Sequence, residues 1–322
     1  MLCGKNLILA TKPYTQEYRL KSWLYVISTF ALLLLFLAGT LFAPSIFIKI
    51  PCSILSGLLI VRYFVIYHDY QHHSILQKSV PANILMTIFG IYILAPSSIW
   101  KRSHDYHHNH NSKLFTADIG SFPIVTKKKF LTMSKSQKFM YLAIRHPINI
   151  LLGYVTIFMI GMSVRSFLSS PKKHFDSLIA LIIHIAGSVL IIYYFGWIEW
   201  LLFIVIPFFI ACSLGSYLFY AQHNFPSVSF CDRRDWHYET AAMESSSYMK
   251  MNKIMAWFTA NIGYHHIHHL NSRIPFYRLP EIMRELPELQ SAKVTSLNPK
   301  EIIACLRLKV WDPEKNKMVG LN

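Results

Sequence analysis

Histidines gather in three short clusters of this chain, and their spacing suits the binding of metal ions. The sequence holds 16 histidines. Residues three and four positions apart share one face of a helix, so imidazoles at i, i+3 and i+4 can be aimed at one point. Two clusters have this HxxHH spacing, and the third has histidines at i, i+4 and i+5. The clusters are His68-Asp69-Tyr70-Gln71-His72-His73, His104-Asp105-Tyr106-His107-His108 and His265-His266-Ile267-His268-His269.

The clusters supply more ligands than one metal ion can take. His223 directly follows a long apolar segment, and we expect it to join the same site. Zinc usually has four ligands. Two six-coordinate irons with positions open for oxygen would use nine or ten histidines, and imidazole suits iron. The expected metal ligands are His68, His72, His73, His104, His107, His108, His223, His265, His268 and His269.

Such a pair of irons is suited to activating O2 against a bond that no acid or base can attack, such as C–H in a saturated chain. The metal carries that chemistry, while the protein positions the substrate and excludes water. We therefore expect no catalytic side chains besides the metal ligands. His110 and His266 adjoin clusters but leave the shared face, and we expect them to support the ligands through hydrogen bonds. The isolated histidines are expected to be structural: His146, His174, His184 and His237.

The elements that must position these histidines are long apolar segments. The chain is 53% hydrophobic and 15% charged, whereas a soluble domain carries about a quarter charged residues. A membrane core of ~30 Å needs about 20 apolar residues as a helix. Five uncharged stretches approach or exceed that length, and a sixth, 50–67, is interrupted by Arg62. The five are 23–43, 79–100, 147–164, 177–198 and 200–222.

The distribution of positive charge predicts which side of the membrane each segment faces. A net charge of +16 would suggest nucleic acid in a soluble protein. Here the basic residues lie between apolar segments, where they set topology, and we expect no nucleic-acid partner. Positive loops stay in the cytoplasm. The segments 23–43 and 177–198 therefore lead out, 50–67 and 200–222 return, and 79–100 and 147–164 are re-entrant or interfacial.

These inferences combine into one fold. We expect an all-α membrane protein with four transmembrane helices in two hairpins, interfacial or re-entrant helices, and a cytosolic helical cap that holds a di-iron site. Residues 1–322 would form a single domain. Both termini and the site would face the cytoplasm, and the membrane would be a cytoplasmic (inner) membrane. His184, which lies within a span, should bond to a neighbouring helix or face a cavity.

At the clusters the sequence resembles the membrane fatty acid desaturase family, most closely acyl-lipid desaturases of the Δ12/ω-type. The match rests on HDYQHH at 68–73, HDYHH at 104–108, YAQHNF at 220–225 and NIGYHHIHHLNSRIPFYRLPE at 261–281. The resemblance implies a four-span fold with a cytosolic cap and two irons bound by the histidines named above. Family members differ over the fifth or sixth position of the first box, so the choice between His72 and His73 stays open. Asp69, Asp105 and Asn261 become candidates for groups that orient the ligands.

The reaction implied by the resemblance uses O2, two external electrons and two protons to form a cis double bond in the acyl chain of a lipid or thioester. Some relatives carry a fused cytochrome b5 domain, but this sequence has no His-Pro-Gly-Gly motif for haem. We expect a separate electron donor of the ferredoxin or cytochrome b5 type, and a basic cytosolic face would attract an acidic donor.

Two other functions are compatible with parts of the pattern. A di-iron hydroxylase or ketolase on the same scaffold shares the first hydrogen abstraction with a desaturase. A metal-ion transporter would place its ligands inside the spans near the midplane, where only His184 lies, so an enzyme is favoured. The sequence leaves the position of the double bond, the chain length and the acyl carrier open.

Overall fold

Four helices of the computed structural model, which describes residues 2–114, 122–230 and 236–321, are long and apolar enough to cross a membrane. Two are α2 (Arg19–Phe42) and α3 (Ile46–Gln71), a helical hairpin. The third is α10 (Phe175–Phe195). The fourth runs from Trp197 to Ala221 and consists of α11 (Trp197–Trp200), η3 (Leu201–Val205) and α12 (Ile206–Ala221). Together with the mostly helical remainder, these helices confirm the expected fold class.

Two glycines allow the close packing of these helices. Gly196 has φ of +97°, a backbone conformation that favours glycine, and it makes the turn between α10 and α11. Gly57 of α3 faces α12, where a Cβ would lie only 2.8 Å from Cβ of Ile210. The backbones of α3 and α12 therefore approach closely. This contact matters for the site, because α3 ends in the first histidine cluster and α12 ends just before His223.

The segment expected to be re-entrant at 79–100 forms two helices that meet at 90°. These are α4 (Val80–Tyr92) and α5 (Ser97–His110). Pro96 caps the start of α5 and lacks the amide that would continue the first helix. The second histidine cluster lies on α5, and the bend between α4 and α5 brings it back beside the end of α3. The segment expected at 147–164 forms α8 (Pro147–Leu151) and η2 (Tyr154–Arg165), and α9 (Ser166–Ser169) follows it.

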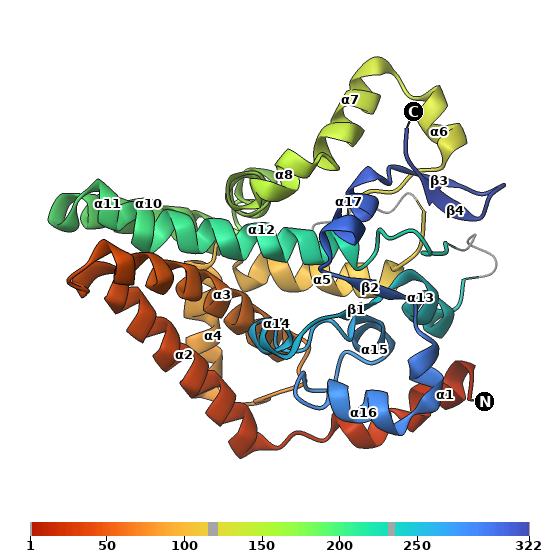
Figure 1. Ribbon diagram of the computed structural model, residues 1–322, viewed down its shortest axis with the longest axis horizontal. Coiled ribbons are helices and arrows are strands. Elements are labelled where there is room, and N and C mark those ends of the chain that lie inside the picture. Colours follow the sequence, from red (N-terminus) through yellow and green to blue (C-terminus); the bar gives the residue numbers. More distant parts are fainter. Residues whose placement is uncertain (1, 115–121, 231–235, 322) are drawn as a thin grey trace.

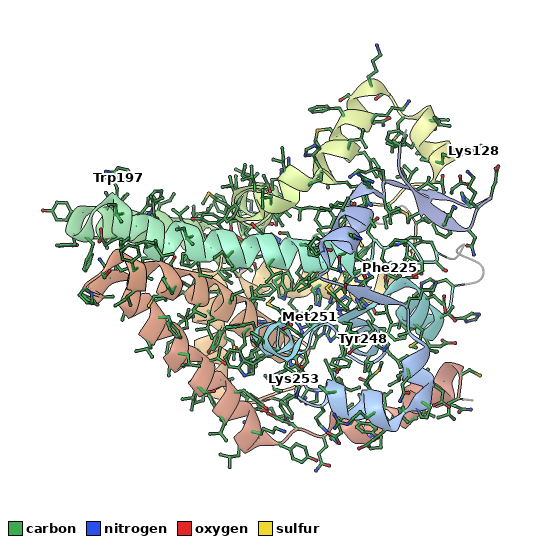
Figure 2. All side chains as sticks on the ribbon, in the orientation of Figure 1. Lys128, Trp197, Phe225, Tyr248, Met251 and Lys253 are labelled. Atoms are coloured by element: carbon green, nitrogen blue, oxygen red, sulfur yellow. The ribbon has the colours of Figure 1, made fainter. Side chains whose placement is uncertain are left out.

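The remaining elements form a cap at one end of the spans (Figure 1). Its helices are α1 (Gly4–Ala10), η1 (Lys12–Thr15), α6 (Lys127–Thr132), α7 (Lys135–Ile144), α13 (Tyr238–Ser245), α14 (Lys253–Phe258), α15 (His265–Leu270), α16 (Leu279–Glu285), η4 (Pro287–Ser291) and α17 (Pro299–Arg307). The strands β1 (Tyr248–Lys250) and β2 (Val294–Ser296) pair in parallel, whereas β3 (Val310–Asp312) and β4 (Lys317–Val319) pair antiparallel. Figure 2 shows Trp197 at the far end of the spans and Lys128 at the opposite end of the molecule.

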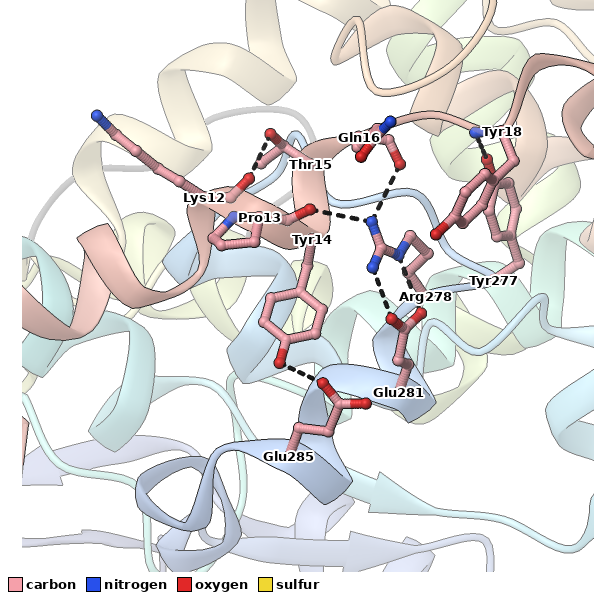
Figure 3. A network of polar contacts seen from close by, with 10 residues as sticks. All are labelled: Lys12, Pro13, Tyr14, Thr15, Gln16, Tyr18, Tyr277, Arg278, Glu281 and Glu285. Atoms are coloured by element: carbon pink, nitrogen blue, oxygen red, sulfur yellow. Dashed lines mark hydrogen bonds and ion pairs between the residues drawn. The ribbon is translucent and has the colours of Figure 1, made fainter.

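The N-terminal segment is tied to the cap by the residues that follow the third histidine cluster (Figure 3). Arg278 donates to the carbonyl oxygens of Pro13 and Gln16 at 3.0 and 3.2 Å. Its Nη2 and Nε donate to the carboxylate of Glu281 at 2.6 and 2.9 Å. The hydroxyl of Tyr277 accepts a hydrogen bond of 2.9 Å from the amide of Tyr18. The start of α2 is thereby fixed against the segment that carries α15 and α16.

Two of the isolated histidines, His184 and His174, connect neighbouring elements. His184 bonds through Nε2 to the hydroxyl of Tyr154 on η2, so this polar group within a span has a partner on a neighbouring element. His174 Nδ1 lies 2.9 Å from the Ser98 hydroxyl. His146 and His237 occupy the positions just before α8 and α13.

Candidate metal centre

Five histidines from three segments converge in the interior of the cap, where we call them the five-histidine group. Their candidate ligand nitrogens all lie within 4.8 Å of one another. Nε2 of His104 is 2.7 Å from Nε2 of His68 and 3.1 Å from Nε2 of His108. The members are His68 and His72 from the end of α3, His104 and His108 from α5, and His268 from α15.

Four more histidines form a second convergence, the four-histidine group, with ligand nitrogens again within 4.8 Å. Nε2 of His223 lies 3.0 Å from that of His107 and 2.9 Å from that of His265. His269 follows at 3.2 Å from His265. The two groups are neighbours, because the ring centroids of His108 and His269 are 4.2 Å apart.

Each HxxHH cluster divides its histidines between the two groups instead of aiming all three at one point. Positions i+3 and i+4 differ by about 100° around a helix axis. His104 and His108 therefore join the five-histidine group, while His107 faces the other. On α15 the division is reversed, since His265 and His269 share the four-histidine group and His268 crosses to the first. Helices α5 and α15 thus each contribute to both groups.

The donor set fits metal binding. At a metal–nitrogen bond of about 2.1 Å, neighbouring ligands are about 3.0 Å apart around a six-coordinate ion and about 3.4 Å apart around a tetrahedral one. Six Nε2–Nε2 pairs in the two groups lie 2.7 to 3.2 Å apart, and all ligand nitrogens of a group lie within 4.8 Å of one another. Five imidazoles in one group also exceed the four ligands usual for zinc. The arrangement favours a metal with more than four ligands in the five-histidine group.

Burial keeps the ligands in the neutral form that metals require. It lowers the pKa values of His265, His268 and His269 well below the usual range, and the neighbouring imidazoles lower them further. Burial lowers the pKa of His223 to about 4, although its bond to a backbone carbonyl opposes the shift. Neutral imidazoles offer a lone pair to a cation.

Two ligand rings are oriented by hydrogen bonds through their other nitrogen. Nδ1 of His68 lies 3.4 Å from Oδ1 of Asp69, a residue that the sequence identified as an orienting candidate. Nδ1 of His223 donates to the carbonyl oxygen of Ser245 at 2.9 Å. Sequence reasoning missed Ser245, because a backbone carbonyl 22 positions away leaves no signal in residue types. Such partners fix the ring and its tautomer.

Two expected site residues lie on the surface beside the first group. Helix α3 ends at Gln71, and His73 has φ of +57°, so its ring turns outward and lies 3.2 Å from Nζ of Lys101. His72 keeps the helical i+4 position relative to His68 and joins the five-histidine group. The side chain of Asp105 is 47% exposed and approaches Lys101 at 3.7 Å, so it does not orient a ligand in this structure.

Three further candidates also make contacts elsewhere. His110 stacks on Tyr106 at the surface and bonds to that residue's carbonyl. His266 is buried, but its Nε2 lies 3.2 Å from the carbonyl of Leu289. Asn261 donates to the carbonyl of Phe276 at 3.2 Å. The expected contacts of these residues with ligand rings are therefore absent among the described residues.

Two apolar cavities that share wall residues lie between α3 and α12, and one of them reaches the histidine groups. The inner cavity is small and is lined by one ligand of each group, His68 and His265, together with apolar side chains of α3 and α12. The neighbouring deep cavity is lined by Ile60, Ile93, Ala211 and Cys212, among others. The walls that both cavities share are Val61, Phe64 and Gly215.

Two more cavities lie on the other side of Phe219. The lateral cavity has a volume of about 540 Å³, and α7, η2 and α12 form most of its apolar wall. Trp100, which stacks on His104 at 4.9 Å, lines its inner end. The polar cavity is smaller, about 40 Å³, and reaches His107 and His223 of the four-histidine group. Phe122 and Phe219 line both of these cavities.

Comparison with known proteins agrees with this geometry. The family model for fatty acid desaturases matches residues 44–299. The chain belongs to the fatty acid desaturase family. The resemblance seen in the histidine clusters is thereby confirmed, and this desaturase is an oxidoreductase that acts on fatty acyl chains.

Three relatives show how far the similarity extends. This desaturase is 29% identical over 319 residues to a protein named fatty acid desaturase from Bacillus subtilis (strain 168), covering 98% of this chain and 90% of the relative. It is 22% identical over 268 residues to an sn-1 oleoyl-lipid 12-desaturase from Picosynechococcus, covering 81% and 75%. It is 23% identical over 235 residues to the chloroplastic omega-6 fatty acid desaturase of Spinacia oleracea, covering 72% of this chain. That match spans about half of the plant protein, 52%.

Proposed function

We propose that this desaturase uses two irons, O2 and electrons from a separate donor to introduce a cis double bond into an acyl chain of a membrane lipid. One observation carries the proposal. The apolar inner cavity is lined by a ligand of each histidine group, His68 and His265. A methylene pair in that cavity would lie beside both groups. The Picosynechococcus relative, named as an oleoyl-lipid desaturase, supports a lipid-bound acyl chain as substrate.

One iron would be held by the five-histidine group and the other by the four-histidine group. Bound iron supplies the oxidising power that removes hydrogen from an unactivated C–H bond. The reaction balances when the chain loses two hydrogens and O2, with two electrons and two protons, becomes two waters. His68 and His223, held by Asp69 and Ser245, keep their Nε2 atoms directed into the groups without reorganisation.

The side chains around the inner cavity position the acyl chain and exclude water. Phe64, Leu218 and Ile262 line it, and it has almost no polar surface besides the two histidines. The methyl end of the chain would continue into the deep cavity, which is lined by Cys212 among others. The lateral cavity, walled by Met140 and Ile144 of α7 among others, offers a route from the membrane. A dry site favours the oxidation of substrate over side reactions with water.

We also propose the placement of the chain in the membrane. The whole chain forms one domain, with its termini, cap and histidine groups on the cytoplasmic side of a cytoplasmic membrane. The positive charge of the segments outside the spans supports this orientation. It also supports docking of an acidic donor of the ferredoxin or cytochrome b5 type, because a basic surface speeds encounter with an acidic protein.

Expression in a bacterial host whose lipids lack polyunsaturated chains tests the proposal. The host should receive this chain together with a ferredoxin and its reductase. Gas chromatography of the total fatty acids should reveal a new cis double bond that is absent with a His107→Ala variant. Hydroxylated or ketonic products in place of an alkene would show that the protein is a hydroxylase or a ketolase instead. Unchanged lipids, despite full-length protein containing iron and reduced donor, would refute the proposal.

A further inference from the structure

Arg145, the C-cap residue that follows α7, is a fully buried cation, and it takes part in none of the ion pairs among the described residues. Among the described residues all its hydrogen-bond acceptors are neutral, and its Nε has no partner there. The acceptors are the carbonyl of Pro123 at 2.8 Å, the hydroxyl of Tyr220 at 3.3 Å, the carbonyl of Leu308 at 3.4 Å and the side-chain oxygen of Asn224. A buried charge left without an opposite charge is strongly unfavourable.

The neighbourhood of Arg145 adds positive charge instead of balancing it. Nζ of Lys309 donates to the carbonyl of Arg145 at 2.9 Å, and burial together with the arginine lowers the pKa of this lysine to about 8. The carbonyl of Leu308, at the end of α17, offers only the partial charge of a helix terminus. These contacts fix the position of the guanidinium, but they do not neutralise it.

A second unpartnered donor lies beside the same cavity. The polar cavity is lined by Arg145 and by Ser112, which is 6% exposed and whose hydroxyl has no hydrogen-bond partner in the part of the chain that the structure describes. Lys113 also lines it. Buried polar atoms are nearly always satisfied, so two residues with orphaned donors on one cavity mark a place where acceptor oxygens, of water or of a ligand, are expected to bind. The volume of about 40 Å³ holds about three water-sized groups, the size of a small oxyanion.

The walls of this cavity indicate what the oxyanion is attached to. Phe122 and Phe219 line both the polar cavity and the apolar lateral cavity. A molecule that fills both has an anionic group joined to hydrocarbon. We propose that the polar cavity binds the phosphate of a phospholipid substrate, with Arg145 as its counterion and the Ser112 hydroxyl as a donor. This inference rests on the proposed desaturation of lipid-bound acyl chains and narrows the lipid to one with a phosphate.

Ser112→Ala is the decisive variant. If the hydroxyl serves only the fold, its removal is neutral or slightly stabilising, because it has no partner to lose. If it binds phosphate, affinity for the phospholipid falls while the melting temperature stays unchanged. Arg145→Gln removes the charge, and Arg145→Lys keeps the charge in case the glutamine variant folds poorly. Lys135→Gln, an exposed position on the same helix, is the matched control for loss of one positive charge.

The test uses full-length, metal-loaded protein in nanodiscs of a neutral galactolipid, containing either phosphatidylglycerol or additional galactolipid with the same acyl chains. Native mass spectrometry measures retained phosphatidylglycerol, and desaturation assays give KM for each lipid. We expect Ser112→Ala to raise KM for phosphatidylglycerol about three- to tenfold and Arg145→Gln about tenfold or more. Retention of phosphatidylglycerol should fall in parallel, whereas KM for the galactolipid should not change. The Lys135→Gln variant should behave like the wild type with both lipids.

Each alternative outcome is distinguishable. The phosphate site is overturned if Ser112→Ala raises KM equally for both lipids, or if it retains as much phosphatidylglycerol as the wild type. Either result leaves the proposed desaturase function standing. If Ser112→Ala raises KM only for a phosphopantetheine thioester, the phosphate belongs to a soluble carrier. That result also overturns the phospholipid proposal. Selective retention without conversion of any acyl lipid supports the site but refutes the proposed function.

Discussion

The backbone amide of Phe276 donates a hydrogen bond of 2.7 Å to Oδ2 of Asp69. The other oxygen of this buried carboxylate faces Nδ1 of His68. Phe276 belongs to the segment IPFYRLPE, which follows the third histidine cluster by a few residues. The segment therefore holds the carboxylate that orients a ligand from the first cluster. The next residues of the same segment, Tyr277 and Arg278, bind the N-terminal segment shown in Figure 3.

Replacing Asp69 by asparagine should weaken iron binding. An amide cannot accept from both His68 and Phe276, because one of its two positions is a donor. Loss of a partner that orients a metal-bound histidine typically lowers metal affinity or activity by about 10- to 100-fold. Asp105→Asn, at the matching position of the second cluster but exposed, is the control. Iron content and turnover would be measured together, and normal values for Asp69→Asn would show that its carboxylate does not orient His68.

His223→Ala should reduce bound iron from about two ions to about one and lower activity by more than about 100-fold. This histidine lies outside the three clusters, yet its Nε2 is within 3.0 Å of two ligand nitrogens in the four-histidine group. His73→Ala should retain both irons and most activity, because its ring faces Lys101. A His223→Ala protein with wild-type iron content, or a His73→Ala protein that loses an iron, would reverse the assignment.

Gly215→Val should shorten the acyl chains that the enzyme accepts. Gly215 lines both the inner and the deep cavity, and a Cβ there meets no heavy atom within 4 Å, so the variant should fold. Overfilling a cavity costs about 1–3 kcal/mol, equivalent to about 5- to 150-fold in kcat/KM for long chains. Gly187→Val on α10, also without a close neighbour, is the control. Competition between acyl chains of different lengths measures the effect, and an unchanged length profile would place the methyl end elsewhere.

The bent pair α4 and α5 should not cross the membrane. Its two flanking clusters supply ligands to the same five-histidine group, so both ends must lie on one side. In a cysteine-free background, single cysteines at Lys78 and Asn109 should react with a membrane-impermeant reagent from the cytoplasmic side only. Trp197→Cys, at the far end of the spans, should react from the other side. Labelling of Lys78→Cys and Asn109→Cys from opposite sides would contradict both the proposed topology and the proposed shared site.

Much of this architecture follows from patterns that sequence displays directly. Helical spacing and apolar length predicted the convergence of clusters such as His104–His108 and the four long helices. The division of each cluster between two groups could not be predicted, because it depends on how α5 and α15 face each other. The exclusion of His73 depends on the residue at which α3 ends. The contacts of Asp105, His110, Asn261 and His266 likewise depend on neighbours that only the fold brings near.

The identity and number of bound metal ions test the central claim most directly. Protein purified from cells grown with iron and zinc, and shown to desaturate lipid with reduced donor, should be analysed by inductively coupled plasma mass spectrometry. Nine convergent, buried histidines in two groups lead us to expect about two irons per chain. Active protein that contains only zinc, one iron or no metal would contradict the account.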